Sequence, residues 1–204
     1  MTKIILASRS PARKKLMKEL GLAFECHASE IFEDMEARKE PKELAMFLAA
    51  EKAKAIAPKY SNAIIIGVDT FVLLHDEKIG KPQTIKNAKK ILQKMSGKIV
   101  EVISGVAVVK TAAGARTKKA ESQEKAQKML TAYASTKLKM KKFTVAEINY
   151  FSNRRKNLSA AGCITIEDEG GKLVEEIDGD FNNVMGLPLF QLQKMLKKLG
   201  IKFS

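Results

Sequence analysis

The sequence predicts an α/β fold, because short apolar runs typical of strands alternate with segments that have helical spacing. At the start of the chain, a strand-like run at residues 3–6 leads directly into a helix that begins at Pro11. Further along, Asp69 lies inside the apolar run of residues 63–74. With 204 residues, the chain can form one sizeable core or two lobes that share a sheet.

The first half of the chain shows this alternation clearly. The helix after Pro11 carries an apolar stripe that includes Leu16 and Leu20. Residues 24–28 predict a second strand, and residues 42–56 predict a long amphipathic helix that ends before Pro58. The apolar run of residues 63–67 then predicts a buried strand, and strand character resumes at residues 71–74. Asp69 is therefore expected at the end of the buried run and inside strand sequence.

The second half of the chain continues the pattern without repeats or low-complexity linkers, so we expect one bilobed domain over residues 1–204. Residues 116–135 are rich in Lys, Glu, Gln and Ala and predict an exposed helical excursion. Helices are expected at residues 85–95, 145–151 and 188–199, and strands at residues 100–109, 137–143, 163–166 and 173–177.

The formal charge of +14 raises the possibility of nucleic-acid binding. Residues 101–156 hold 13 basic and 4 acidic residues, so the excess lies in the middle of the chain. Aromatic residues make up only 6% of the sequence and Trp is absent, whereas nucleic-acid readers usually combine positive charge with aromatic side chains. The pattern favours a solvated lysine surface, and any nucleic-acid binding is expected to be weak, salt-sensitive and independent of sequence.

Localisation and cysteine chemistry can also be predicted. Apolar stretches fall well short of the roughly 20 residues of a membrane span, and charged and turn residues follow residues 4–7 at once. We therefore expect a cytoplasmic protein. Cys26 and Cys163 lack metal-ligand spacing with His27 and His75, so a structural zinc is not expected and both thiols are expected to be buried and reduced.

The turn between the first strand and the first helix has the composition of a phosphate site. Ser8, Ser10, Arg9 and Arg13 surround the beginning of the helix, where backbone N–H groups and the helix dipole favour oxygen anions. Arginine adds a fork of donors that suits phosphate. An alternative is that Ser8 or Ser10 only caps the helix.

Asp69 is the first candidate for catalysis, because a carboxylate in a buried strand must be hydrogen-bonded, paired or metal-bound. Alternatively, Asp69 caps a turn through its own backbone. Lys81 lies between a glycine and a proline in a loop, and Lys52 lies on the long helix, where a surface lysine is the alternative. Glu30 and Glu33 can offer oxygen ligands to Mg²⁺, or they are ordinary acidic loop residues.

Phosphoanhydride hydrolysis needs cations that offset phosphate charge and a base that, with a metal, activates water. The candidates for these roles are Ser8, Arg13, Glu33, Lys52, Asp69 and Lys81.

Short motifs lie along nearly the whole chain, at residues 8–13, 29–33, 51–54, 68–70, 80–82, 104–106, 161–162 and 183–189. They resemble those of the Maf family of nucleoside triphosphate pyrophosphatases, which are related in fold to inosine triphosphatases. The resemblance implies a mixed twisted sheet with flanking helices, and two lobes around a deep cleft. It also implies release of pyrophosphate from a nucleoside triphosphate, Asp69 as proton acceptor, a divalent cation (Mg²⁺ or Mn²⁺) held by Glu33 and Asp69, and commonly a homodimer.

Three positions bear on the base that is recognised. Ala12 replaces a second arginine found in the branch that acts on dTTP and UTP, and Glu167 replaces a glutamine of that branch. Both favour the 7-methyl-GTP branch, since a glutamate can accept hydrogen bonds from guanine N–H groups. Thr70 favours the dTTP and UTP branch instead. We therefore expect 7-methyl-GTP pyrophosphatase activity, with dTTP/UTP pyrophosphatase or a basic, non-catalytic nucleic-acid-binding protein as alternatives.

Overall fold

The computed structural model describes residues 2–112 and 128–202 and has a mixed α/β fold, as predicted. In the described residues the strands follow the order β2-β1-β3-β5-β6-β7, and β4 pairs with β3. The chain divides into two compact units, and it passes from one unit to the other within β3, β5 and β6. None of the helices formed by the described residues combines the length and the apolar composition that crossing a membrane requires.

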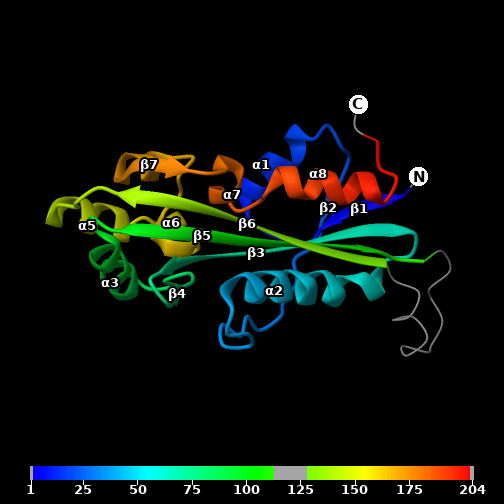
Figure 1. Ribbon diagram of the computed structural model, residues 1–204, viewed down its shortest axis with the longest axis horizontal. Coiled ribbons are helices and arrows are strands. Elements are labelled where there is room, and N and C mark those ends of the chain that lie inside the picture. Colours follow the sequence, from blue (N-terminus) through cyan, green and yellow to red (C-terminus); the bar gives the residue numbers. More distant parts are fainter. Residues whose placement is uncertain (1, 113–127, 203–204) are drawn as a thin grey trace. The chain divides into compact units, whose positions relative to one another are not determined.

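The first unit consists of Met1–Asp69, Gly105–Tyr133 and Gly186–Ser204. In it, β1 lies between β2 and β3 and runs parallel to both. Figure 1 shows α2 on one side of these strands, and α1 and α8 on the other. Its elements are β1 (Lys3–Leu6), α1 (Pro11–Glu19), β2 (Glu25–Cys26), α2 (Pro41–Ile56), the 3-10 helix η1 (Ala57–Lys59), α8 (Leu189–Lys198) and parts of β3 (Ala63–Leu74), β5 (Ile99–Lys110) and β6 (Lys128–Met140).

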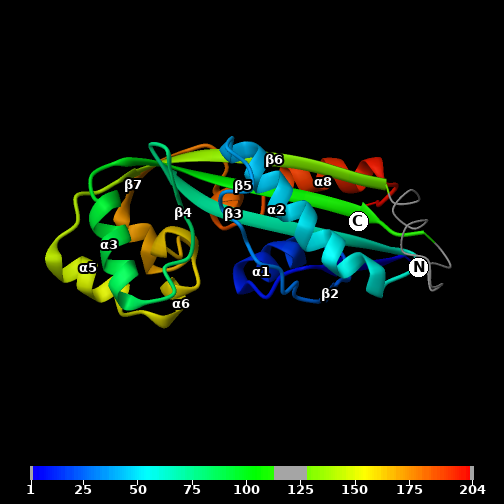
Figure 2. The ribbon, with the colours of Figure 1, turned by 90° about the horizontal axis from the view of Figure 1, so that it is seen from below.

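Two glycines on neighbouring strands let α2 lie unusually close to the sheet, and Figure 2 shows α2 crossing over β3 and β5. A Cβ atom on Gly67 would lie 2.1 Å from the carbonyl oxygen of Ala49, and one on Gly105 would lie 2.0 Å from the carbonyl oxygen of Ala45. Both distances are far below van der Waals contact, so only glycine permits this approach. The core between α2 and the strands accordingly uses small side chains, among them Ala49, Ala50, Ala53, Ala57, Ala63 and Ala107.

The second unit consists of Thr70–Ser104 and Ala134–Met185. Here β4 pairs antiparallel with β3, and β7 pairs antiparallel with β6. Helix α3 contacts α5, α6 and η2. Its further elements are β4 (Glu77–Ile79), α3 (Ile85–Met95), α5 (Val145–Ser152), α6 (Arg155–Leu158), the 3-10 helices η2 (Ala161–Cys163) and η3 (Glu169–Leu173), β7 (Val174–Asp178) and α7 (Phe181–Val184).

Two predicted segments differ from the structure. The helical excursion expected at residues 116–135 is wrong for residues 128–135, which belong to strand β6, while residues 116–127 lie outside the described residues. The strand expected at residues 163–166 is wrong, because Gly162 and Cys163 both have positive φ angles and turn the chain within η2. Asp69 lies inside strand sequence, as expected, and residues 63–74 form the single strand β3.

The basic residues of β6 face acidic residues of β7. The register places Lys137 opposite Asp178 and Lys139 opposite Glu176, and Nζ of Lys139 lies 3.0 Å from a carboxylate oxygen of Glu175. Opposite charges across strands stabilise the pairing and offset part of the positive charge. This arrangement agrees with a solvated lysine surface on β6 and gives no support to a nucleic-acid interface there.

We predict that Gly67→Ala destabilises the protein by about 3 kcal/mol, because the added methyl group would overlap the backbone of α2. Gly80→Ala is the control, since a Cβ there meets open space and should change the stability by less than about 1 kcal/mol. Urea unfolding followed by circular dichroism measures both. Equal midpoints for Gly67→Ala and the parent protein would contradict the close approach of α2.

The two cysteines should differ sharply in reactivity. Cys163 is buried, as expected, but the prediction that Cys26 is buried is wrong, because Cys26 lies exposed on the two-residue strand β2. Burial raises the pKa of the Cys163 thiol to about 12, so this thiol stays protonated and unreactive at pH 8.

We predict that a thiol reagent modifies Cys26 rapidly and Cys163 only after unfolding. Cys26→Ser should abolish the rapid phase, and a rapid phase that persists would show that Cys163 is accessible.

Candidate active site

The turn between β1 and α1 is held by two serine hydroxyls. The backbone N–H of Arg13 donates to Oγ of Ser10 (3.4 Å), which caps α1, and the backbone N–H of Ser10 donates to Oγ of Ser8 (3.2 Å). The capping alternative is therefore confirmed for Ser10. Ser8 is buried, and its hydroxyl accepts a hydrogen bond within the turn instead of capping the helix.

Arg13 fastens three segments of the first unit to one another. Its Nε donates to the carbonyl oxygen of Gly186 (2.8 Å), and its Nη1 donates to the carbonyl oxygen of Val68 (3.0 Å) and to Oγ of Ser8 (3.4 Å). Because Val68 directly precedes Asp69, these bonds bring the guanidinium to the position on β3 where the candidate base lies. The sequence predicts Arg13 only as a phosphate-binding residue, because its bonds to Gly186 and Val68 depend on tertiary structure.

Lys52 is a buried lysine shared by two carboxylates, not a surface lysine. Its Nζ lies 2.5 Å from Oδ1 of Asp69 and 2.7 Å from Oε1 of Glu33. The Lys52 and Asp69 side chains are only 8% and 5% exposed, whereas that of Glu33 is 36% exposed. Side chains alternate along a strand, so Asp69 shares the face of β3 that carries Gly67 and lies under α2. The close approach of α2 at Gly67 thus brings Lys52 to Asp69.

The electrostatics join Arg13 to the same cluster. Burial lowers the pKa of the Arg13 guanidinium, while the nearby carboxylates of Asp69 and Glu33 raise it. Arginine keeps its proton throughout the physiological range, so two cations face two carboxylates. Because these charges balance, a polyphosphate needs further positive charge in order to bind.

The remaining predicted residues belong to other positions. Ala12 lies half-buried on α1 of the first unit. Lys81, which is exposed in the loop after β4, and Glu167, which is exposed in a turn before η3, belong to the second unit. The structure thus gathers Ser8, Arg13, Glu33, Lys52 and Asp69 in the first unit, and a shared site with Lys81 and Glu167 stays a prediction.

Thr70 begins a polar network within the second unit. Its hydroxyl lies 2.9 Å from that of Ser104, which donates to the carbonyl oxygen of Asn183 (3.2 Å). Nδ2 of Asn183 in turn donates to the carbonyl oxygen of Val102 and to Oγ1 of Thr136, both at 3.0 Å. The sequence contains Ser104 and Asn183 in segments that resemble the Maf family, but it gives no indication that they fix Thr70.

The donor set suits a divalent cation that arrives with a phosphate ligand. Among the described residues, groups of three or more His, Cys, Asp or Glu side chains that could enclose a metal are absent. Mg²⁺, however, is commonly bound by one or two carboxylates together with substrate phosphates and water. Glu33 and Asp69 already share one cation, the ammonium of Lys52, so their oxygens fit this mode of binding.

The fold and this cluster define an α/β protein with a buried acid and paired cations that are suited to a substrate rich in anionic oxygens. Residues 3–199 match the family described as Maf-like protein, and the chain belongs to that family.

Relatives of known annotation span nearly the whole chain. A dTTP/UTP pyrophosphatase from Methanococcoides burtonii is 38% identical over 98% of this chain and 97% of that protein. Enzymes of the same name from Dictyoglomus thermophilum and Bacillus cereus are 37% and 36% identical, over 97% and 98% of this chain and 96% and 97% of theirs. A solved HAM1 protein from Coxiella burnetii aligns with a TM-score of 0.43 at 16% identity, over 69% of this chain and 73% of that one.

We predict that Lys52→Met destabilises the protein by about 3–5 kcal/mol, because it leaves the buried carboxylate of Asp69 without its cation. The double variant Lys52→Met with Asp69→Asn should recover about 2 kcal/mol, since the buried charge is then removed as well. Lys54→Met is the matched control on the same helix. Its ion pair with Glu51 is exposed, so the change should stay within about 0.5 kcal/mol.

Urea unfolding of the parent protein, Lys52→Met, Asp69→Asn and the double variant forms a double-mutant cycle. A double variant that is less stable than Lys52→Met would contradict the assignment, because it would show that Asp69 is not the group that Lys52 stabilises.

Proposed function

We propose that this protein is a nucleoside triphosphate pyrophosphatase that converts dTTP and UTP to their monophosphates with release of pyrophosphate. The observation that carries the proposal is the buried Asp69 carboxylate, which is paired with Lys52 and lies next to Val68, the residue whose carbonyl group binds the Arg13 guanidinium. It supplies a base and cations within one cluster. Family membership supports the reaction class, and the names of the relatives support the substrates.

In the proposed reaction, Asp69 accepts a proton from the water that attacks the α-phosphorus. The bond between that phosphorus and the oxygen leading to the β-phosphorus breaks, and the leaving oxygen departs as pyrophosphate. Lys52 fixes the orientation of the Asp69 carboxylate, and Arg13 with the Ser8 turn lies where phosphate oxygens would be held. A divalent cation held by Glu33 and Asp69 would offset the negative charge of the phosphates.

The base preference proposed here differs from the one expected from Ala12 and Glu167. The relatives support the dTTP/UTP alternative better than 7-methyl-GTP, in agreement with Thr70. Thr70 is fixed by hydrogen bonding to Ser104, whereas Glu167 is an exposed turn residue. An exposed carboxylate gains little from a hydrogen bond to a base because water competes for it, so Glu167 is the weaker indicator of specificity.

The test is turnover of dTTP, UTP and 7-methyl-GTP with Mg²⁺ or Mn²⁺, in which monophosphate and pyrophosphate are measured separately. We expect dTTP and UTP to have the higher kcat/KM. Asp69→Asn removes the base while it keeps the shape, and should lower kcat by about 100-fold or more. Asp76→Asn, an exposed carboxylate in the turn after β3, is the matched control and should retain activity.

Release of orthophosphate with a diphosphate product would contradict the proposal, since the γ-phosphorus would then be the one attacked. A higher kcat/KM for 7-methyl-GTP would show that Ala12 and Glu167 report the substrate. Nearly normal kcat in folded Asp69→Asn protein would show that another residue is the base.

A further inference from the structure

Asn183 lies on α7 and is completely buried, although its side chain is polar. Its Nδ2 donates to the carbonyl oxygen of Val102 on β5 and to Oγ1 of Thr136 on β6, both at 3.0 Å. Oγ of Ser104, also on β5, donates to the backbone carbonyl oxygen of Asn183 (3.2 Å). One residue thus fastens α7 to two neighbouring strands of the sheet. The reaction proposed above assigns no role to it.

Thr136 holds the beginning of the same helix. Its Oγ1 donates to the carbonyl oxygen of Asp180 and accepts from the backbone N–H of Asp180, both at 3.1 Å. The side chain of Asp180 caps α7, because it accepts from the backbone N–H of Asn182 (2.8 Å). Hydrogen bonds to the sheet therefore hold this short helix at its N-terminal cap and again at Asn183.

The orientation of the Asn183 amide follows from its partners. A carbonyl oxygen can only accept, and the single proton of the Thr136 hydroxyl is donated to Asp180, so both partners of Nδ2 are acceptors. Oδ1 lies on the other side of the amide, where it is buried and has no hydrogen-bond donor among the described residues. A buried polar atom without a partner is costly, and natural proteins tolerate such costs mainly at functional positions.

A second buried asparagine shows the usual arrangement. Nδ2 of Asn157 donates to the carbonyl oxygen of Phe151 (3.0 Å), and its Oδ1 accepts from the hydroxyl of Thr165 (3.0 Å). Both ends of this amide are satisfied, as expected for an asparagine that only stabilises the fold. Asn183 departs from this arrangement at Oδ1.

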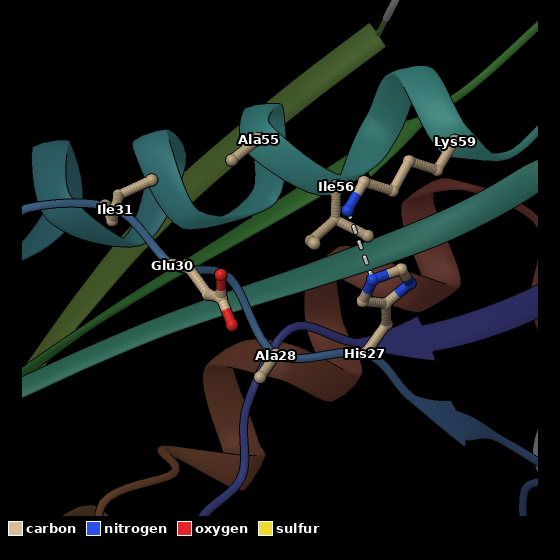
Figure 3. A pocket seen from close by; sticks show the side chains of 7 residues that line it. All are labelled: His27, Ala28, Glu30, Ile31, Ala55, Ile56 and Lys59. Carbon is tan, nitrogen blue, oxygen red and sulfur yellow. Dashed lines mark hydrogen bonds between the residues drawn. The ribbon is translucent and has the colours of Figure 1, made fainter.

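The polar groups of the pocket beside α2 also differ from the Asn183 amide. This pocket of about 460 Å³ lies between the end of α2 and the loop that follows β2 (Figure 3). His27 is half-buried and lies 3.3 Å from Nζ of Lys59, and Glu30 is exposed. Water can satisfy such groups, so none of the seven side chains that line the pocket is both buried and in need of a polar partner.

The segment that Asn183 holds leads directly to a partner of Arg13. Two backbone hydrogen bonds, at 3.3 and 3.0 Å, close a helical turn over residues 180–185. Gly186 follows this turn, and its carbonyl oxygen accepts from Nε of Arg13 (2.8 Å). Because a hydrogen-bonded turn moves as one piece, the position of the Gly186 carbonyl group depends on the bonds that fasten Asn183.

We propose that Asn183 is a positioning residue for the proposed reaction, because it holds the α7 turn and with it the Gly186 carbonyl group that orients the Arg13 guanidinium. Without this anchor, Arg13 keeps its bonds to Val68 and Ser8 but loses a fixed acceptor for Nε. A guanidinium with fewer fixed partners samples more orientations, and a displacement of about 1 Å in a substrate-positioning group can lower the rate about 100-fold. The inference rests on the proposed function, because it concerns a phosphate-binding residue of that reaction.

The first test is kcat/KM for dTTP in Asn183→Leu, which keeps a similar volume but removes the donors. We expect a loss of about tenfold or more at a temperature at which thermal melting shows the variant to be folded. Thr136→Val removes one acceptor of Nδ2 and should act in the same direction, whereas Thr136→Ser keeps the hydroxyl and should retain activity. These two variants decide the question if Asn183→Leu does not fold.

Thr111→Val is the matched control. The Thr111 hydroxyl is buried and bonds to both the backbone N–H (2.9 Å) and the carbonyl oxygen (3.3 Å) of Ala63, as the Thr136 hydroxyl does with Asp180. Neither Thr111 nor Ala63 belongs to the α7 segment. Thr111→Val should therefore lower the stability but leave kcat/KM of the folded protein unchanged.

Arg13→Ala separates positioning of Arg13 from a general structural effect. If Asn183 acts through Arg13, Asn183→Leu should have little further effect in protein that already carries Arg13→Ala, so the two losses of kcat/KM do not multiply. Losses that multiply would overturn the inference, because Asn183 would then act independently of Arg13.

Solvent exchange of the Arg13 Nε–H, followed by NMR, is a measurement without turnover. In Asn183→Leu and in Thr136→Val this proton should exchange about tenfold faster than in the parent protein, and in Thr111→Val at the parent rate. If the exchange is faster but the parent protein does not hydrolyse dTTP, the proposed function fails and the positioning of Arg13 by Asn183 stands. If the parent protein hydrolyses dTTP, and Asn183→Leu and Thr136→Val change neither kcat/KM nor the exchange, the inference is overturned and the function stands.

Discussion

The close contact between α2 and the sheet is the constraint on which the candidate site depends. Gly67 and Gly105 lie on adjacent strands and contact the carbonyl groups of Ala49 and Ala45, which are one helical turn apart. Because the helix lies this close, the Lys52 side chain contacts Asp69, and both side chains are buried. An ion pair in such a place is costly to form without close geometry, because both charges lose their hydration. The two glycines and the alanines of α2 provide that geometry.

Arg13 is held in place by hydrogen bonds at the turn between β1 and α1, as Lys52 is by its ion pairs. Its bonds reach the turn itself, β3 at Val68 and the segment before α8 at Gly186. A guanidinium presents its donors in a fixed plane, so these acceptors hold it in one orientation. This second cation of the cluster is thus set in place by the fold before any phosphate arrives, which reduces the entropy lost on binding.

Local pattern predicted most of the elements, and tertiary contacts decided the rest. Helix α3 was predicted at its observed bounds, because its apolar spacing and its capping residue Thr84 are both local features. Strand β6 was missed over residues 128–135, because its polar and small side chains resemble an exposed helix and only pairing within the sheet makes it a strand. Cys26 was misjudged because the two-residue strand β2 lies at the sheet edge. The sequence predicted three candidate site residues that lie together in the structure, namely Glu33, Lys52 and Asp69. Their direct contact was not predictable, because it depends on the close approach of α2 to Gly67 and Gly105.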